Sequence, residues 1–438
     1  MDGDDSPGPS SGPAGKQPSA RAMASARAAA LAQGRAAQLA DMQPLRDGRR
    51  EALLARALAE LRSLQVARDL AEAAAVPAGL QAAATVAREA AGSATREAGE
   101  GALAAARALA LARSHPADWC HVGWLEEQRG EDEAARMAYA QALQLAPAHL
   151  GAHLHATLLG ARSGPLEQAA AQAAAARAQL GDVPVAGLLV GIVQGLAGQH
   201  DAARATLRAL LAAVAEPAPR QVVLALWLLR LEQPVPARAM LQVALGQDAR
   251  SVSALLAQAL VLEADGDMAQ AERSVARALQ LAPGDGMALA CRAFLLEARG
   301  RLDAARQGYE RAVEVMPACG ISWLGLARVC ERSAAWKDAE QAYAQARERL
   351  AGRAEPHLGL AFARHGLKRP AEALQDVAAA LERDPGQPLA CLLGAVLSGD
   401  RLGNWAAALE HLLRCQALGG AYPGLPAWIA SAQAKAGR

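Results

Sequence analysis

The sequence WCHVGWLEEQRGEDEAARMAYAQALQLAP, residues 119–147, contains a pattern that recurs along most of the chain. It begins with Trp119, has Gly130 near its middle, and continues with Ala135, Tyr139 and Pro147. Steps of 34 residues from Ala135 reach an alanine every time, at Ala169, Ala203, Ala237, Ala271, Ala305, Ala339, Ala373 and Ala407. A constant period of this length, divided by a turn glycine, predicts a series of stacked helix pairs.

Other columns of the repeat support this prediction, which matters because alanine is common in this chain. We number repeat positions from residue 116. Position 24 holds Tyr139, Tyr309 and Tyr343, which are three of the four tyrosines in the protein. Position 8 is always small, with Gly123, Thr157, Gly191, Ala225, Ala259, Ala293, Ala327, Ala361 and Ala395. Small residues let two helices approach closely, and a large side chain at position 24 fills the space between repeats.

These columns resemble the tetratricopeptide-repeat family, whose 34-residue unit has an aromatic residue at position 4, small residues at positions 8 and 20, an aromatic at 24 and proline at 32. The resemblance implies an all-α fold, a right-handed α-solenoid (superhelix) of stacked antiparallel helix pairs. It also implies that the first helix of each pair lines a concave groove, with positions 2, 5, 9, 12 and 13 facing it. Proteins that look like this are mostly binding scaffolds.

The chain divides into four predicted regions. Residues 1–47 are expected to be mostly disordered, because residues 1–20 are rich in Ser, Pro, Gly and Asp and any helix after them is marginal. Residues 48–115 are expected to form N-terminal helices, with an amphipathic helix over 49–75 and a degenerate repeat at 82–115. Nine repeats follow at 116–421, the ninth with one extra residue before its turn. A capping helix is expected at 422–438.

The repeat predicts a peptide-binding groove along the first helices. Apolar side chains occupy positions 5 and 9 of most repeats, and both phenylalanines fall at position 9. Glutamates at position 12 would form an acidic row that could hold a Lys or Arg of a ligand. The predicted groove residues are Trp124, Leu154, Leu158, Leu188, Ile192, Val222, Leu226, Leu256, Leu260, Phe294, Phe362, Glu263, Glu297 and Glu331. Two alternatives stay open: tight packing could bury this stripe, or the helix over 49–75 could lie in it.

No catalytic site, metal site or cofactor is predicted. The chain lacks the Gly- and His-based catalytic motifs and has no close cysteine pair. His149, His153 and His155, with Cys120 and His121 one repeat earlier, are the best candidate metal ligands, and their spacing does not favour zinc. A carboxylate clamp or an asparagine ladder is not expected in the groove, since Asn404 is the only asparagine and falls in a turn.

Composition limits the class of partner. The formal net charge is +1, so neither nucleic acid nor a membrane surface is expected as a partner, and no stretch is apolar enough for membrane insertion. We therefore expect a cytoplasmic, non-catalytic scaffold or adaptor that binds an apolar or amphipathic segment of a protein or peptide, in assembly, secretion or a chaperone role. Self-association is left open. The alternative is a regulatory or substrate-recruiting subunit of a separate enzyme, such as a glycosyltransferase.

Overall fold

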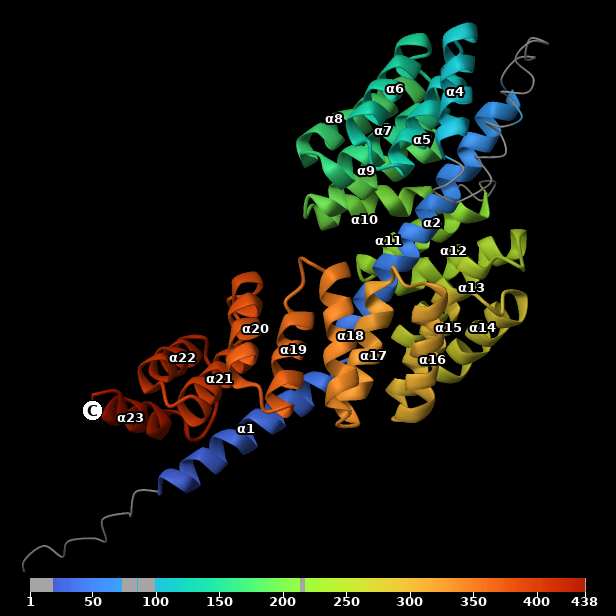
Figure 1. Cartoon of the computed structure of the whole chain (residues 1–438). Coiled ribbons are helices and arrows are strands. Elements are labelled where there is room, and N and C mark those ends of the chain that lie inside the picture. The colour runs from blue at the N-terminus through green and yellow to red at the C-terminus, as the bar shows by residue number, and fades with distance from the viewer. Residues whose placement is uncertain (1–18, 73–84, 86–98, 213–216, 438) are drawn as a thin grey trace, which may run out of the picture. The chain divides into compact units, whose positions relative to one another are not determined.

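The computed structural model describes residues 19–72, 85, 99–212 and 217–437 (Figure 1). In this part of the chain every regular element is helical, and nine helix pairs fall in the nine predicted repeat windows. In order they are α5 (Pro116–Gln128) with α6 (Asp132–Leu145), α7 (Leu150–Ser163) with α8 (Leu166–Leu180), α9 (Pro184–Leu196) with α10 (His200–Ala209) and η3 (Leu210–Ala212), α11 (Ala218–Arg230) with α12 (Pro234–Gln247), α13 (Val252–Ala264) with α14 (Met268–Leu281), α15 (Gly286–Ala298) with α16 (Leu302–Val315), α17 (Gly320–Arg332) with α18 (Trp336–Arg349), α19 (Glu355–Gly366) with α20 (Pro370–Arg383), and α21 (Pro388–Ala395) with α22 (Trp405–Ala417). The predicted all-α class of stacked helix pairs is confirmed.

The described residues form two compact units, one from Arg46 to Leu295 and the other made of the residues up to Leu45 and from Leu296 onward. Within each unit, neighbouring first helices pack on one another, α5 on α7 and α17 on α19 for example. The second helix of each pair packs beside the first helices, and the residues that it buries there include those at positions 20 and 24. In the first repeat Ala135 and Tyr139 share one buried cluster with Ala152 and Leu159 of α7.

In most repeats the turn between paired helices has a left-handed residue at position 15, whereas Gly164 of the second repeat is extended. Gly130 takes the left-handed conformation with φ +82°. Three repeats place a residue with a Cβ there instead: Glu232 (φ +59°), Ala334 (φ +54°) and Lys368 (φ +61°). A Cβ is disfavoured in this region, so these three turns carry local strain.

The ninth pair absorbs its extra residue as a π-helical turn, η4 (Val396–Arg401), which follows α21 directly. A π-turn adds one residue to a helix without breaking it, and the following elements then return to register. The sequence assigned Ala407 to position 20, but Ala408 is the fully buried alanine of α22. The assignment of Ala407 was wrong by the one inserted residue.

The N-terminal segment differs from the sequence prediction. Helix α1 (Ala20–Ala40) and helix α2 (Gln43–Glu72) cover residues that were expected to be mostly disordered up to residue 47, while residues 1–18 lie outside the described part. Alanine favours the helix, and tertiary docking stabilises it. Helix α4 (Gly99–Arg113) covers the second part of the predicted degenerate repeat at 82–115, while residues 82–84 and 86–98 lie outside the described residues.

At the other end, α23 (Leu425–Ala436) takes the place of the predicted capping helix and packs Trp428 into the core of the ninth repeat. None of the described helices combines the length and the apolar character needed to cross a bilayer.

Candidate peptide-binding groove

Every predicted groove residue is buried in this structure, from Trp124 in α5 to Phe362 in α19. This burial agrees with the two alternatives in which the stripe is covered, by tight packing or by the helix predicted over 49–75. Apolar side chains on the first helices of the repeats are buried only where another part of the chain packs against them. Helices α1 and α2 contact these first helices. Binding of a separate peptide by these residues stays a prediction.

Helix α2 contacts the first helices of four pairs within the unit Arg46–Leu295. At one end, Arg62 pairs with Glu127 of α5, and its Nε donates to His155 Nδ1 of α7 over 2.9 Å. At the other end, Ser253 of α13 donates to Glu60, and the Arg49 guanidinium lies over the ring of Phe294 in α15. The alternative in which the helix predicted over 49–75 lies in the groove is thus the arrangement that the structure shows.

Helix α1 occupies the equivalent position in the other unit. Its Arg35 pairs with Glu331 of α17, and its Arg27 pairs with Asp400 of η4. Gly34 allows a close approach, because a Cβ there would lie 2.8 Å from Leu389 Cδ1 in α21. These partners again lie in the first helices of their pairs.

Both N-terminal helices bury a row of residues spaced by four. In α1 the row is Arg27, Leu31, Arg35 and Leu39. In α2 it is Arg49, Leu53, Ala57, Leu61, Gln65 and Asp69. Four residues advance an α-helix by about 400°, so this row winds around α2 by roughly 200° over its length. A row that winds in this way lets the repeats contact successive sides of the same helix.

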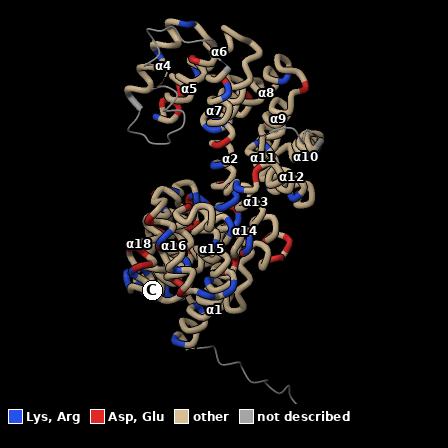
Figure 2. The backbone as a smooth tube through the Cα atoms, turned by 90° about the vertical axis from the view of Figure 1, so that its right-hand side faces the viewer, with Lys and Arg blue, Asp and Glu red and all other residues tan. Residues whose placement is uncertain are grey.

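The predicted acidic row is present, and arginines of the chain itself neutralise most of it. Glu331 accepts two hydrogen bonds from Arg35, at 2.7 and 2.6 Å. Glu263 accepts one from Arg46 at 2.7 Å and one from Arg49 at 2.6 Å. Bidentate and charge-assisted bonds of this kind are the strong class of hydrogen bond. Bands of Lys and Arg recur along α2 in Figure 2.

Tyrosines at position 24 donate hydrogen bonds to glutamates at position 12 of the same repeat. Tyr343 donates to Glu331 over 2.6 Å and Tyr139 donates to Glu127 over 3.0 Å, each within one repeat. The tyrosines are buried, and burial raises the pKa of Tyr343 well above its usual value. A neutral phenol therefore holds each carboxylate in place for its arginine.

Glu297 is the exception, because its arginines belong to the repeats. Arg328 and Arg332 of α17 lie 3.7 and 3.5 Å from it. Burial raises the pKa of Glu297 even with these two cations beside it. Arg328 also donates to the backbone carbonyls of Leu39 and Asp41, each over 2.7 Å, and so holds the C-terminal end of α1.

Asp400 belongs to the same acidic row and escaped the sequence prediction. Counted without the inserted residue, it occupies position 12 of the ninth repeat, and Arg27 Nε donates to its Oδ2 over 2.9 Å. The late turn at Gly403 was visible in the sequence. Moving the count by one residue at that point would have added Asp400 to the row.

An open cavity of about 660 Å³ flanks α1 in its unit. Its walls include Ala32 and Ala36 of α1, together with Glu331, Trp336 and Phe362 of the repeats. Alanine side chains on this side of α1 leave the space beside the Arg35 contact unfilled. The groove of this unit is therefore wider than the helix that it holds.

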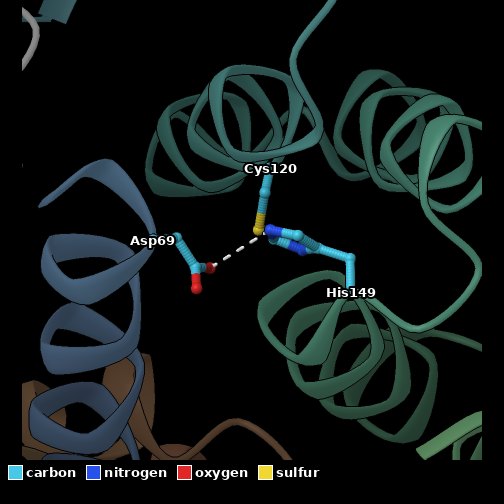
Figure 3. A group of neighbouring side chains, drawn as sticks. All are labelled: Asp69, Cys120 and His149. Atoms are coloured by element: carbon cyan, nitrogen blue, oxygen red, sulfur yellow. Dashed lines mark ion pairs between the residues drawn. The ribbon is translucent and has the colours of Figure 1, made fainter. Parts of the chain in front are cut away.

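A group of three possible metal ligands joins α2 to the first two repeats. Asp69, Cys120 and His149 have ligand atoms within 4.8 Å of one another (Figure 3). However, the Ala152 backbone N–H donates to His149 Nδ1 over 3.1 Å, so the neutral ring carries its proton on Nε2, the nitrogen 3.8 Å from Asp69. That nitrogen offers a proton to the carboxylate rather than a lone pair to an ion. Burial lowers the pKa of His149 to about 4 and raises that of the Cys120 thiol well above its usual value.

This trio is therefore best described as a polar contact between the end of α2 and the first two repeats, with Asp69 and Cys120 buried. Two of the other histidines considered from the sequence, His155 and His153, have structural partners. His155 stacks on Tyr139 with ring centroids 5.5 Å apart, and His153 Nε2 lies 2.7 Å from the Pro147 carbonyl. Absence of a metal stays a prediction. The six cysteines are free thiols.

No protein-family model and no curated protein matches the chain. Among solved structures it is similar to PilF of Pseudomonas aeruginosa, with 19% identity over 51% of this chain and 99% of that one and a TM-score of 0.44. It is also similar to PilW, a type IV pilus biogenesis factor, with 20% identity, coverage of 48% and 97% and a TM-score of 0.43. YrrB, a TPR protein with an unusual peptide-binding site, shows 17% identity, coverage of 42% and 94% and a TM-score of 0.33.

These likenesses concern the fold alone. The helix pairs, their 34-residue period and the packing of alanine at position 20 against tyrosine at position 24 come from the chain itself. By these features the chain has the fold of the tetratricopeptide-repeat proteins.

Proposed function

We propose that this protein is a non-catalytic interaction scaffold whose groove binds an amphipathic helix of a partner protein. One observation carries the proposal: the first helices of the repeats already hold helices that are not part of the repeat array. Helices α1 and α2 each bury a row of residues spaced by four, α2 also buries Leu45, Leu54, Val66 and Leu70, and the residues that both helices expose are polar or small. Helix-in-groove recognition uses the same kind of segment, an amphipathic helix with anchors on one side.

A partner helix must compete with α2, which is tethered to the groove. Tethering gives α2 an effective concentration in the millimolar range for a flexible connection. A free helix at micromolar concentration therefore binds only after α2 is weakened, or when its own contacts are better. This competition makes the intact chain a scaffold with a partly self-occupied groove.

The test uses the full chain and a fluorescent peptide with the sequence of residues 43–72. Ala57→Arg places a large cation at a fully buried position of α2, while Ala55→Arg makes the same change at an exposed position of the same helix. Both substitutions retain a good helix former. We expect the peptide to bind the Ala57→Arg chain saturably, and to bind the wild-type and Ala55→Arg chains at least about tenfold more weakly because their own α2 competes.

Fluorescence anisotropy measures the binding, and circular dichroism verifies that the repeats of each variant remain helical. No binding to a folded Ala57→Arg chain would refute the proposal. Equal binding to all three chains would also refute it, because the peptide would then attach outside the groove. Leu158→Asp or Leu260→Asp in the Ala57→Arg background should abolish binding if the predicted groove residues form the site.

A further inference from the structure

The two phenylalanines of this chain occupy equivalent places in the repeat array. Phe294 and Phe362 both lie at position 9, each one repeat after a glutamate at position 12, Glu263 and Glu331 respectively. In each case the glutamate and the ring contact the same arginine of an N-terminal helix. We call each pair of residues an arginine socket: Glu263 with Phe294, and Glu331 with Phe362.

The contacts in the two sockets follow one plan. In the first, Arg49 donates to Glu263 over 2.6 Å, and its guanidinium carbon lies 3.3 Å from the centre of the Phe294 ring. In the second, Arg35 makes two bonds to Glu331 and its guanidinium carbon lies 4.5 Å from the centre of the Phe362 ring. Both arginines are buried.

We propose that these sockets select arginine over lysine, so that the partner of the groove is an amphipathic helix with arginine on its buried row. This inference rests on the proposed function and specifies the partner. A guanidinium is planar and weakly hydrated, so it can bond a carboxylate in its plane and stack a face on a ring. An ammonium group is a compact, strongly hydrated charge that gives up more water on burial and presents no face to stack.

The rest of the acidic row agrees with this preference for arginine. Arg62 pairs with Glu127 in the same way. Position 9 of the next repeat is Leu158 and not a phenylalanine there, and Arg62 bonds His155 instead. Arg328 fills the place beside Glu297 from within the repeats. Each carboxylate of the row described above has an arginine as its ion-pair partner, and the row includes Asp400 with Arg27. The sockets are thus built around the guanidinium group.

The chain supplies a matched control within the first socket. Arg46 and Arg49 bond the same Glu263, but the Arg46 side chain is 41% exposed and that of Arg49 is 3% exposed. Exposed ion pairs contribute little and tolerate lysine, whereas buried, stacked ones do not. Arg46→Lys and Arg49→Lys therefore make the same chemical change against the same carboxylate in different surroundings.

The experiment measures binding of three peptides of residues 43–72 to the Ala57→Arg chain: wild type, Arg46→Lys and Arg49→Lys. We expect Arg49→Lys to bind at least about tenfold more weakly than wild type and Arg46→Lys to bind within about twofold of it. If the wild-type peptide does not bind, the proposed function fails. If it binds and Arg49→Lys binds equally well, the scaffold function stands and the socket is refuted.

A second comparison isolates the ring. Adding Phe294→Leu to the Ala57→Arg chain keeps an apolar side chain but removes the aromatic face, so the ratio between wild-type and Arg49→Lys affinities should shrink at least about threefold. An unchanged ratio in a chain of unchanged helicity would show that the ring takes no part in selection, and the socket as defined would be wrong.

Discussion

Replacing Glu331 by glutamine should release α1 from its groove. Glu331 and Arg35 are both buried and joined by two hydrogen bonds, and Tyr343 donates to the same carboxylate. Glutamine retains one acceptor oxygen but turns an N–H₂ group toward Arg35 or Tyr343. The substitution therefore leaves a buried cation without its counter-charge.

The size of the effect follows from the cost of breaking a buried ion pair, about 3–5 kcal/mol. We take about 3 kcal/mol because one acceptor remains, which corresponds to a change of roughly 100-fold in an equilibrium constant. Arg35 escapes the cost when α1 leaves the groove, so the loss appears in the docking equilibrium of α1 before it appears in the stability of the repeats.

Hydrogen exchange followed by mass spectrometry measures this loss locally. Exchange of the α1 amides, residues 20–40, should become roughly 100-fold faster, because an isolated helix of this length is marginal in water. Exchange in α20, residues 370–383, serves as the internal reference for the repeats and should change little.

Glu340→Gln is the matched control. Glu340 also bonds two arginines, Arg364 and Arg369, but it lies on α18, the second helix of its pair, and these partners belong to the repeats. The Glu340→Gln variant should keep the rate of α1 amide exchange within about twofold of the wild-type rate. Equal α1 exchange in the Glu331→Gln and wild-type chains would show that the socket does not hold α1, and the reasoning on buried pairs in this groove would be wrong.

Three further predictions concern the turns, the histidines and the approach of α1. Ala334→Gly relieves a left-handed alanine and should stabilise its repeat by about 1 kcal/mol, seen as a higher urea midpoint; a lower midpoint contradicts this. Burial, and then the nearby arginine of α2, lowers the pKa of His155 well below 6.5. The unfolded chain therefore takes up a proton that the folded chain resists, so thermal stability should fall as pH drops below about 6.5, and His155→Gln should reduce that slope. Gly34→Leu should clash with Leu389 and speed exchange of α1, whereas Gln33→Leu at an exposed position of the same helix should not.

The sequence was informative wherever a feature repeats with the period of the fold. Each helix pair falls in its predicted window because small residues at positions 8 and 20 recur in the repeats, and in the first repeat Ala135 and Tyr139 show the packing that these columns serve. The groove residues were predicted by the same logic, and so was the acidic row of Glu263, Glu297 and Glu331 that could hold a Lys or Arg of a ligand. Periodicity reports what all repeats share.

Which arginines pair with these glutamates could not be predicted in this way. Arg35 and Glu331 are 296 residues apart, and Arg49 and Glu263 are 214 apart, so no local pattern connects them. Helix α1 was missed for a related reason. Its buried row alternates arginine with leucine among alanines, which gives little contrast between its sides, and only docking on the repeats decides which residues are buried.

The π-turn of the ninth repeat shows how register and function are coupled, and it gives the last prediction. The π-turn Val396–Arg401 accommodates the one residue beyond the 34-residue count, and within it the buried hydroxyl of Ser398 has no hydrogen-bond partner among the described residues. Deleting Ser398 returns Asp400 to position 12 of an ordinary α-helix and leaves the turn at Gly403 in register. We expect the deletion to preserve the contact between Arg27 and Asp400 and to stabilise the repeat by about 1 kcal/mol, by removing an unsatisfied polar group.

Slow α1 exchange together with an equal or higher melting temperature in the deletion variant would mean that the π-turn only accommodates an extra residue. Fast α1 exchange in a folded deletion variant would mean the opposite, that the π-turn itself directs Asp400 toward α1. In that case Asp400→Asn should release α1 to the same extent, because both changes would act through the same lost ion pair with Arg27. The two variants together therefore separate the geometry of the turn from the charge that it carries.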